Sequence, residues 1–452
     1  MDEAKGISKK LIDFIYYLKY EDLPSNVILQ AKRCLLDYLG VVLGGSVTET
    51  ANKMRLFLSK FNDNPEVTVI GYHKKTDLFK AALVNGITSH VLELDDGHRY
   101  ATVHAGAAII SALLPLIEKQ KDINGKEAIV SLVAGYETAL IIGRSIHPSH
   151  RERGFHATAT CGTIGAAMAA SKALRLTKKE MSNALGMAGS SASGLLQFLE
   201  DGSELKQFHP GKAALNGLLS AYLAQSGLTA PENILEGKRG FLKAETDKYD
   251  IPDVNNLGKR YAIMDVYFKP YAACRHCHAP IEAILNIYNK YNLKINEIEK
   301  IIISTYKSAV DGHSNPCPHS VVGAKMSVPF SIAVAMKTGW AGPKEFAPNF
   351  FDDPEILEIT KKIEVKEDPS LSILVPERRP AIIEIFTKTG NKIVERVDFP
   401  KGEPENPISY NELKRKFRGL ASYSRSKVEM EKIIEIVEDV ENKIRSIFQF
   451  IN

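Results

Sequence analysis

The sequence predicts a mainly α-helical protein in which a large helical bundle, formed by both ends of the chain, carries a smaller inserted α+β lid domain. Three observations lead to this prediction. Apolar residues recur at helical spacing up to about residue 265, strand-like segments appear between residues 266 and 402, and helical spacing then returns. We therefore expect one all-helical domain from residues 1–265 and 403–452, and an α+β lid from residues 266–402.

The bulk composition is that of an ordinary globular protein. A chain of 452 residues is longer than one hydrophobic core usually serves, and 44% of its residues are hydrophobic. The net charge of +4 is small and dispersed, so we expect no nucleic-acid partner. The N-terminal segment lacks the apolar core of a secretion signal, and we see no window long enough to cross a bilayer. We expect a cytoplasmic protein without a membrane partner, and its five scattered cysteines predict no disulfide framework.

Helix boundaries in the first half follow from caps and apolar periodicity. Asn124 and Thr177 each precede a glutamate by three residues, which is the pattern of a capping box. Helices are expected over residues 12–18, 27–42, 78–92, 107–117, 128–146, 157–173, 181–199 and 213–223, with a short strand at 67–71. The helix over 157–173 is rich in small residues, which let helix backbones approach closely, so we place it at the centre of the bundle.

The second half mixes both periodicities. We expect helices over residues 279–291, 326–336 and 354–363, a strand over 298–306, and a hairpin of strands 381–387 and 392–397. A linker rich in Pro and Gly, residues 400–407, ends this block. Ser409 then caps a return to helix, and residues 427–448 have the pattern of one long amphipathic helix.

One short stretch, residues 93–106, concentrates ionisable side chains between two apolar helical runs. Its charged and imidazole side chains are those of Glu93, Asp95, Asp96, His98, Arg99 and His104. A solvated helix end held by ion pairs would contain the same residue types. However, His104 begins the next helix, where free backbone N–H groups favour an anion. A carboxylate beside an imidazole also makes an acid/base pair near neutral pH, so we interpret the stretch as half of an active site.

A metal site is the competing interpretation of the same stretch. Asp95, His98 and His104 have side chains that could coordinate a cation. The sequence offers neither a histidine pair four residues apart nor an obvious further ligand there, so we expect no metal. Residues 274–278 match the Cys-x-x-Cys-His haem-attachment pattern, but such haem is attached outside the cytosol and a single match is weak. We therefore expect no cofactor.

Three later clusters also stand next to predicted helix starts. His156 precedes the small-residue helix, Lys206 and His209 lie in a polar loop before the helix at 213, and Lys269 leads to the basic segment 274–278. Singly, each could be a surface loop or a core histidine. Together they suggest cations and imidazoles converging on a small anion. The sequence contains no phosphate-binding glycine loop, dinucleotide fingerprint or nucleophile-elbow serine, so the expected chemistry is cofactor-free proton transfer.

These segments, in this order, resemble the MmgE/PrpD family, which includes 2-methylcitrate dehydratase, cis-aconitate decarboxylase and iminodisuccinate epimerase. Residues 92–106 are similar to the family's Asp-Phe-Asp-Asp-Thr and His-Pro-Gly segment, and residues 154–165, 206–214 and 269–278 correspond to later landmarks. The resemblance implies a homodimer and a pocket between a helical domain and a lid, where a proton moves next to a carboxylate without a metal. Glu93, Gly97 and Ala105 depart from the family's usual Asp, Thr and Pro, which alters the substrate end of the pocket.

The resemblance and the residue chemistry together give a predicted site. Predicted catalytic residues are His104, Glu93, Asp95, His156, Lys206 and His278. Predicted substrate-binding residues are Lys269, Arg275, Asp96, His98 and His209. We expect His104 to exchange the proton, Asp95 or Glu93 to orient it, and His156 or His278 to act as the second acid.

The predicted function is that of a lyase acting on a small di- or tricarboxylate. We rank a 2-methylcitrate dehydratase-like reaction first and keep epimerisation and decarboxylation as alternatives, because all three share the intermediate formed when a proton leaves the carbon next to a carboxylate. Two other classes would fit the same residues: a carboxylate-binding protein without turnover, and a metallohydrolase, whose activity a chelator would remove.

Overall fold

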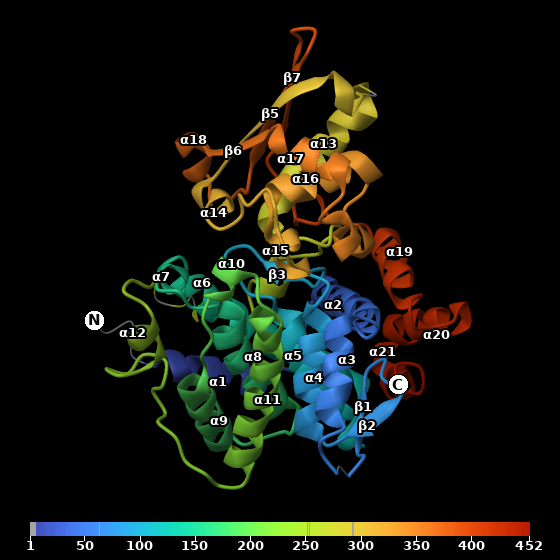
Figure 1. Cartoon of the computed structure of the whole chain (residues 1–452). Helices are drawn as coiled ribbons and strands as arrows, with labels where there is room; N and C mark the ends of the chain where they lie inside the picture. Colours follow the sequence, from blue (N-terminus) through green and yellow to red (C-terminus); the bar gives the residue numbers. More distant parts are fainter. Residues whose placement is uncertain (1–5, 63, 251, 253, 292) are drawn as a thin grey trace.

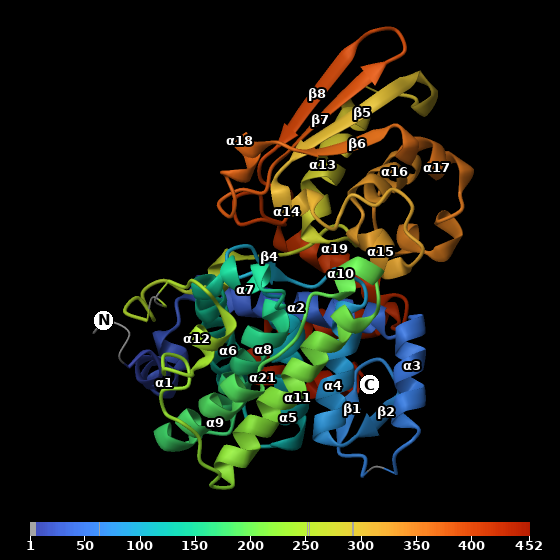
Figure 2. The ribbon, with the colours of Figure 1, turned by 60° about the vertical axis from the view of Figure 1, so that its left-hand side comes forward.

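The computed structural model describes residues 6–62, 64–250, 252, 254–291 and 293–452. The chain is mainly helical and its sheets are small, so the predicted fold class is confirmed. A broad helical bundle forms the lower part of the molecule in Figure 1, and a layer of strands and helices covers it from above. The largest sheet lies entirely within this upper layer (Figure 2).

The bundle is assembled around one helix made of small residues. Its helices are α1 (Ile7–Tyr17), α2 (Ser25–Gly45), α3 (Glu49–Leu58), α4 (Leu78–His90), α5 (Ala105–Lys119), α6 (Gly125–Ile146), α7 (Ser149–Glu152), α8 (Ala157–Ala173), α9 (Lys178–Ser191), α10 (Phe198–Asp201), α11 (Leu205–Gln225) and α12 (Phe241–Glu245). Helix α8 packs against α5, α6, α9 and α11. A Cβ atom on Gly165 would lie 2.8 Å from the backbone oxygen of Gly135, so these two glycines let α6 and α8 approach closely. The predicted central position of this helix is confirmed.

Helix α6 corrects one expectation. It is long and apolar enough to span a bilayer by length and composition, whereas the sequence analysis expected no such segment. Its apolar window is 89% buried inside the protein, which is the environment of a core helix. Asn124 and Glu127 form the predicted capping box at its start.

The lid is built on a four-stranded sheet with the order β6-β5-β7-β8. Its elements are α13 (His278–Tyr291), β5 (Ile298–Thr305), α14 (Lys307–Val310), α15 (Val321–Met326), α16 (Val328–Thr338), α17 (Pro354–Lys361), β6 (Ile363–Glu367), α18 (Pro369–Ser372), β7 (Ala381–Thr387) and β8 (Lys392–Val397). The predicted hairpin is confirmed, because β7 and β8 pair antiparallel. Strand β6, which runs parallel to β5, was not predicted, because only its first and third residues are apolar and the segment is half exposed.

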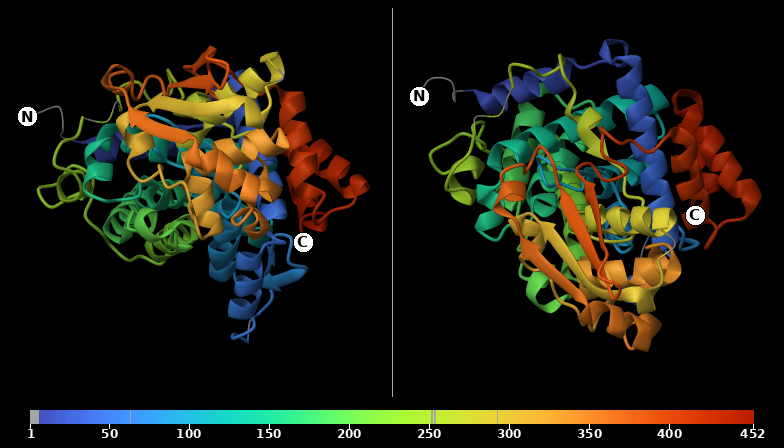
Figure 3. Two further views of the ribbon diagram at one scale, coloured as in Figure 1. Left: turned by 45° about the horizontal axis from the view of Figure 1, so that its top comes forward. Right: turned by 90° about the horizontal axis from the view of Figure 1, so that it is seen from above.

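The C-terminal helices return to the bundle. Helix α19 (Tyr410–Ala421) packs along α2, where Phe417 lies against Gly40, and α20 (Lys427–Glu438) follows it. Seen from above, these helices lie beside α2 at the edge of the molecule (Figure 3). The predicted single helix over 427–448 is wrong, because Asp439 leaves helical geometry with φ −120° and ψ 43° and the chain continues as α21 (Val440–Lys443) and η7 (Ile444–Gln449).

Helix α11 corrects the most consequential boundary. It begins at Leu205 rather than at residue 213, so Lys206 and His209 lie in a helix and not in a loop. Pro210 and Gly211 have the local appearance of turn residues, which is why the sequence predicts a loop there. A glycine is instead needed there for packing against α4, since a Cβ atom on Gly211 would lie 2.3 Å from the Leu83 backbone oxygen. Helix α9 in turn ends at Ser191 rather than at residue 199.

Four further short strands form two antiparallel pairs. Strands β1 (Val67–Val69) and β2 (Lys74–Thr76) form a small antiparallel ribbon that confirms the strand predicted at 67–71. Strand β3 (Gly97–His98) pairs antiparallel with β4 (Val266–Tyr267). This second ladder joins the charged stretch 93–106 to the segment that leads into the lid.

Candidate active site

The charged stretch 93–106 connects α4 to α5 and is buried, so it is not a solvated helix end. Glu93, Asp95 and Asp96 are at most 3% exposed. Glu93 has a φ of 55°, in the left-handed region that non-glycine residues rarely adopt. A Cβ atom on Gly97 would lie 2.4 Å from the Tyr267 hydroxyl oxygen, which explains why the threonine common in the resembled family is absent here.

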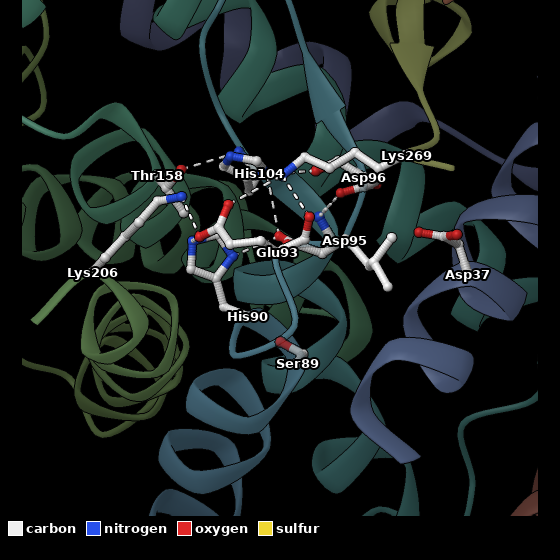
Figure 4. A network of polar contacts seen from close by, with 12 residues as sticks. Asp37, Ser89, His90, Glu93, Asp95, Asp96, His104, Thr158, Lys206 and Lys269 are labelled. Carbon is white, nitrogen blue, oxygen red and sulfur yellow. Dashed lines mark hydrogen bonds and ion pairs between the residues drawn. The ribbon is translucent and has the colours of Figure 1, made fainter. Parts of the chain in front are cut away.

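His104 and Asp95 form a hydrogen-bonded relay with a third residue, His90. The Asp95 Oδ2 atom lies 3.2 Å from His104 Nδ1 and 2.8 Å from His90 Nδ1 (Figure 4). His104 Nδ1 also donates to the backbone oxygen of Asp96 at 2.7 Å. Because Nδ1 carries the proton, Nε2 keeps its lone pair, and it has no hydrogen-bond partner among the described residues.

The electrostatics of this relay keep His104 uncharged in the absence of a ligand. Burial lowers the pKa of His104 to about 4 in spite of the neighbouring Asp95, so the ring is neutral at pH 7. Burial opposes ionisation of Asp95 as well, but His90 and His104 outweigh it and hold the pKa of that carboxyl well below its usual value. A carboxylate therefore fixes the tautomer of an uncharged imidazole. His90 was missed by the sequence analysis because it ends an apolar helix, outside the stretch singled out.

Glu93 binds two lysines. Its carboxylate contacts Lys206 Nζ, and its Oε2 atom lies 3.2 Å from Lys269 Nζ. Burial opposes ionisation of Glu93, but the two ammonium groups outweigh it and hold its pKa well below the usual value. Lys206 lines the cavity described below, whereas Lys269 is completely buried behind it. The structure thus pairs both lysines with a carboxylate of the protein.

Asp96 anchors the loop to the bundle. Its carboxylate accepts from the Tyr136 hydroxyl at 2.6 Å and from the Gly106 backbone N–H at 3.0 Å. Gly106 lies in the first turn of α5, where a carboxylate is favourable. Burial raises the pKa of Asp96 to about 7. Its oxygens contact groups of the protein rather than the cavity, so its geometry is that of a positioning residue.

This pKa gives a pH-dependent prediction for stability. A carboxyl whose pKa rises from 3.8 in the unfolded chain to about 7 in the folded protein binds more protons when folded. Its contribution to stability is therefore complete below pH 4 and is lost as the pH rises through 7. Between about pH 4 and pH 7, the free energy of unfolding of wild type should therefore fall relative to that of Asp96→Asn, by up to about 1.4 kcal/mol per pH unit.

Urea denaturation of both proteins from about pH 5 to about pH 8 measures this difference. Glu137, whose pKa burial also raises to about 7, is unchanged in the variant and cancels in the comparison. A difference in unfolding free energy that stays constant across this range would contradict the shifted pKa of Asp96.

His156 and His209 form a second imidazole pair. His156 precedes α8 as its N-cap residue, and its Nδ1 atom lies 2.8 Å from Nδ1 of His209 on α11. One of these two nitrogens must donate the proton of the hydrogen bond. His156 lines the cavity and His209 lies behind it. The structure therefore brings one more imidazole to the cavity on which His104 opens.

Three predicted site residues use polar side-chain atoms in hydrogen bonds within the protein. His278 accepts from Arg275 at Nδ1 and donates to the Ala273 backbone oxygen at Nε2, so neither ring nitrogen is free. Arg275 donates to Glu403, Lys401 and Pro400 and stacks on the Tyr267 ring. His98 accepts from the Ala101 backbone N–H and does not line the cavity. Of the two residues predicted as the second acid, only His156 reaches the cavity.

The cavity lies between the bundle and the lid and is lined by residues from both. Its ionisable lining residues are His104, His147, Arg151, His156, Lys206, Tyr267, Cys274, Arg275, His276, His313 and Arg379. No carboxylate lines it in the part of the chain that the structure describes. The Arg151 guanidinium has no hydrogen-bond or ion-pair partner among the described residues, and the Arg379 side chain makes one hydrogen bond, to the Arg99 backbone oxygen. The cavity therefore presents positive charge that a small anion can neutralise.

Sequence reasoning missed both of these arginines. Arg151 stands three residues before Gly154, so extending the cluster at 154–156 backwards would have included it. Arg379 lies between β6 and β7 in a segment without any motif, and only the folded lid brings it to the cavity.

Two groups of side chains are arranged so that they could hold a metal ion. One is the relay of His90, Asp95 and His104, and the other is Cys274 with His276 and His313. His90 takes the place that the sequence analysis gave to His98 in its competing metal interpretation. The predicted absence of a metal cofactor stays a prediction.

Two family models together match most of the chain. The MmgE/PrpD N-terminal domain matches residues 9–252, and the MmgE/PrpD C-terminal domain matches residues 271–442. A cis-aconitate decarboxylase of Aspergillus terreus is 27% identical over 96% of this chain and 92% of its own length. Cis-aconitate decarboxylases of Mus musculus and Homo sapiens are 27% and 26% identical, over 97% of this chain in both cases and over 91% and 92% of their own lengths. The predicted lyase class is confirmed at the level of these relatives, and the chain belongs to the MmgE/PrpD family.

Proposed function

We propose that the protein is a cofactor-independent lyase that breaks a bond next to a carboxylate in a small di- or tricarboxylate. One observation carries the proposal: His104 Nε2 has no partner among the described residues, while its ring lines a cavity with arginine and lysine side chains and no described carboxylate. A base beside an array of cations is suited to moving a proton at a carbon that carries carboxylates.

In the proposed reaction, cations hold the substrate and His104 moves the proton. Arg151 and Arg379 are suited to binding carboxylates, because a guanidinium can donate two parallel hydrogen bonds to one carboxylate. Negative charge develops on the substrate as its bond breaks, and each well-placed cation stabilises this charge by roughly 3 kcal/mol. The Asp95 carboxylate stabilises the imidazolium that His104 becomes when it holds the proton.

Decarboxylation of cis-aconitate or a close analogue is the first candidate reaction. The named relatives that align over nearly the whole chain support it. The bond to one carboxylate carbon breaks, carbon dioxide leaves, and the electron pair stays on the carbon skeleton, where an imidazolium adds a proton. A bound polyanion raises the pKa of nearby imidazoles, which would supply the protonated form.

Dehydration of a 2-methylcitrate-like hydroxy acid is the second candidate. It requires a neutral base and a second proton carrier on one cavity, and His104 and His156 supply two imidazoles there. His104 would take the proton from carbon, and His156 would give a proton to the leaving hydroxyl group.

A substrate panel separates these reactions. Purified protein is incubated with cis-aconitate, citrate, 2-methylcitrate and an iminodiacid in deuterated buffer, with a chelator present. Carbon dioxide release identifies the decarboxylase, water elimination identifies the dehydratase, and deuterium incorporation alone identifies an epimerase. Binding of an acid without any of these reactions would contradict the lyase proposal and indicate a carboxylate-binding protein. Loss of activity in the presence of the chelator would contradict cofactor independence.

Arg151 provides a specific test of substrate binding. Replacing it with alanine should lower kcat/KM by roughly 30-fold to 1000-fold, with most of the effect in KM, because a charge-assisted bidentate contact is lost. Arg153, two residues away, is paired with Asp247 on the surface and provides the matched control as Arg153→Ala. Equal kinetics for the two variants would exclude Arg151 as a substrate ligand.

A further inference from the structure

A second cluster of ionisable side chains lies on the lid side of the same cavity and has no role in the proposed reaction. It consists of Cys274, which precedes the turn η3 (Arg275–Cys277), of His276 within that turn, and of His313, which follows α14. Each residue offers one potential ligand atom, and these three atoms lie within 4.8 Å of one another. The Cys274 Sγ atom is 3.4 Å from His313 Nε2, and the rings of His276 and His313 are 4.7 Å apart at their centres.

An outer contact orients His313 toward the sulfur, and an outer contact of His276 leaves its other ring nitrogen available. His313 Nδ1 donates to the Asp311 backbone oxygen at 2.9 Å, which leaves the lone pair of Nε2 facing Cys274. His276 Nδ1 lies 2.7 Å from the Tyr306 hydroxyl, and its Nε2 has no partner among the described residues. A histidine whose second ring nitrogen is held by a carbonyl or another polar group is the usual arrangement of a metal ligand.

The residue types define the class of ion. One thiolate and two imidazoles suit zinc and similar transition metals, whereas magnesium and calcium require oxygen ligands. Three protein ligands leave a fourth position of a tetrahedral site open, and all three residues line the cavity. Arg151 and Arg379 face the same space, so their charge opposes a bare cation, and an anionic fourth ligand such as a carboxylate would relieve this repulsion.

We propose that Cys274, His276 and His313 form a transition-metal site whose occupation by Zn²⁺ inhibits the enzyme. The metal takes the thiolate and two neutral imidazoles, displaces the thiol proton to solvent, and turns its open position toward the cavity. An ion there occupies space that a substrate carboxylate needs and binds that carboxylate away from His104. The inhibition rests on the proposed function, whereas the binding does not.

Cobalt provides a direct probe of binding that needs no activity. Full-length protein, freed of metal with a chelator, is titrated with Co²⁺ while its absorption spectrum is recorded. One ion per chain and a sulfur-to-cobalt charge-transfer band are expected. Cys274→Ser should abolish that band, and Tyr306→Phe, which removes an outer contact, should weaken binding by roughly 10-fold. The exposed thiol of Cys317 supplies the matched control, since Cys317→Ser should leave the spectrum unchanged.

The relay cluster supplies the competing outcome. If the cobalt signal survives Cys274→Ser and disappears in His90→Ala, the ion binds at His90, Asp95 and His104 and the proposal is wrong. Absence of a sulfur band in wild type overturns it equally. In the activity arm, Zn²⁺ should inhibit wild type and Cys317→Ser but not Cys274→Ser. A protein without turnover on the panel would refute the proposed function and leave the binding result intact.

Discussion

Replacing His104 with alanine should lower the turnover number by roughly 100-fold to 10 000-fold on the substrate that the panel identifies, because general acid–base catalysis contributes about this much. The ring opens on the cavity and is backed by Asp95, so its removal takes away the proton carrier and leaves the cationic lining in place. KM should therefore change little. Steady-state kinetics with wild type and the variant measure both constants.

The control for this variant is another histidine. His319 is exposed and belongs to no hydrogen-bonded pair among the described residues, so His319→Ala should retain full turnover. Added imidazole should restore part of the activity of His104→Ala, which a merely structural loss would not allow. If His104→Ala keeps more than about one tenth of wild-type turnover, another group carries the proton.

Replacing Glu93 with glutamine should destabilise the folded protein by about 3–5 kcal/mol, because removing one partner of a buried ion pair leaves an uncompensated charge. Here two ammonium groups, Lys206 and Lys269, lose the same carboxylate, and both are at most 5% exposed. Denaturant unfolding at neutral pH measures the loss. Glu93→Asp keeps the charge and should retain most of the stability.

Glu204 offers a matched comparison for this variant. It also pairs with a lysine, Lys53, but both side chains are more than two-fifths exposed. An exposed pair contributes at most about 1 kcal/mol, so Glu204→Gln should change stability only slightly. Equal losses in the two glutamine variants would show that the buried lysines are compensated by something other than Glu93.

The sequence was sufficient wherever a local signal decides the structure. Capping residues such as Asn124 and Thr177 place helix starts because the cap satisfies free N–H groups of the same helix. Strand β7 alternates buried and half-buried residues, which is why its hairpin could be predicted. The family resemblance depended on short motifs in a fixed order.

Features that depend on a neighbouring segment could not be predicted in this way. Gly211 has the local appearance of a turn residue, and only its close contact with α4 explains why a glycine stands at this position of a helix. The place of Arg379 on the cavity arises from tertiary packing that no spacing along the chain encodes. His90 and Asp95 are only five residues apart, but the irregular loop between them, with Glu93 at a φ of 55°, brings their side chains together. His278 shows the converse, since a motif position suggested catalysis while both ring nitrogens bond to protein groups.

The ladder between β3 and β4 joins the candidate site to the segment that enters the lid. Gly97 and His98 pair with Tyr267 and Val266, so the loop that bears Asp95 and His104 is fastened to the chain at the point where it enters the lid. A lid that swings outward must either break this two-residue ladder or pull the loop with it. If the proposed function holds, we therefore expect the positions of Asp95 and His104 to depend on the lid staying docked on the bundle.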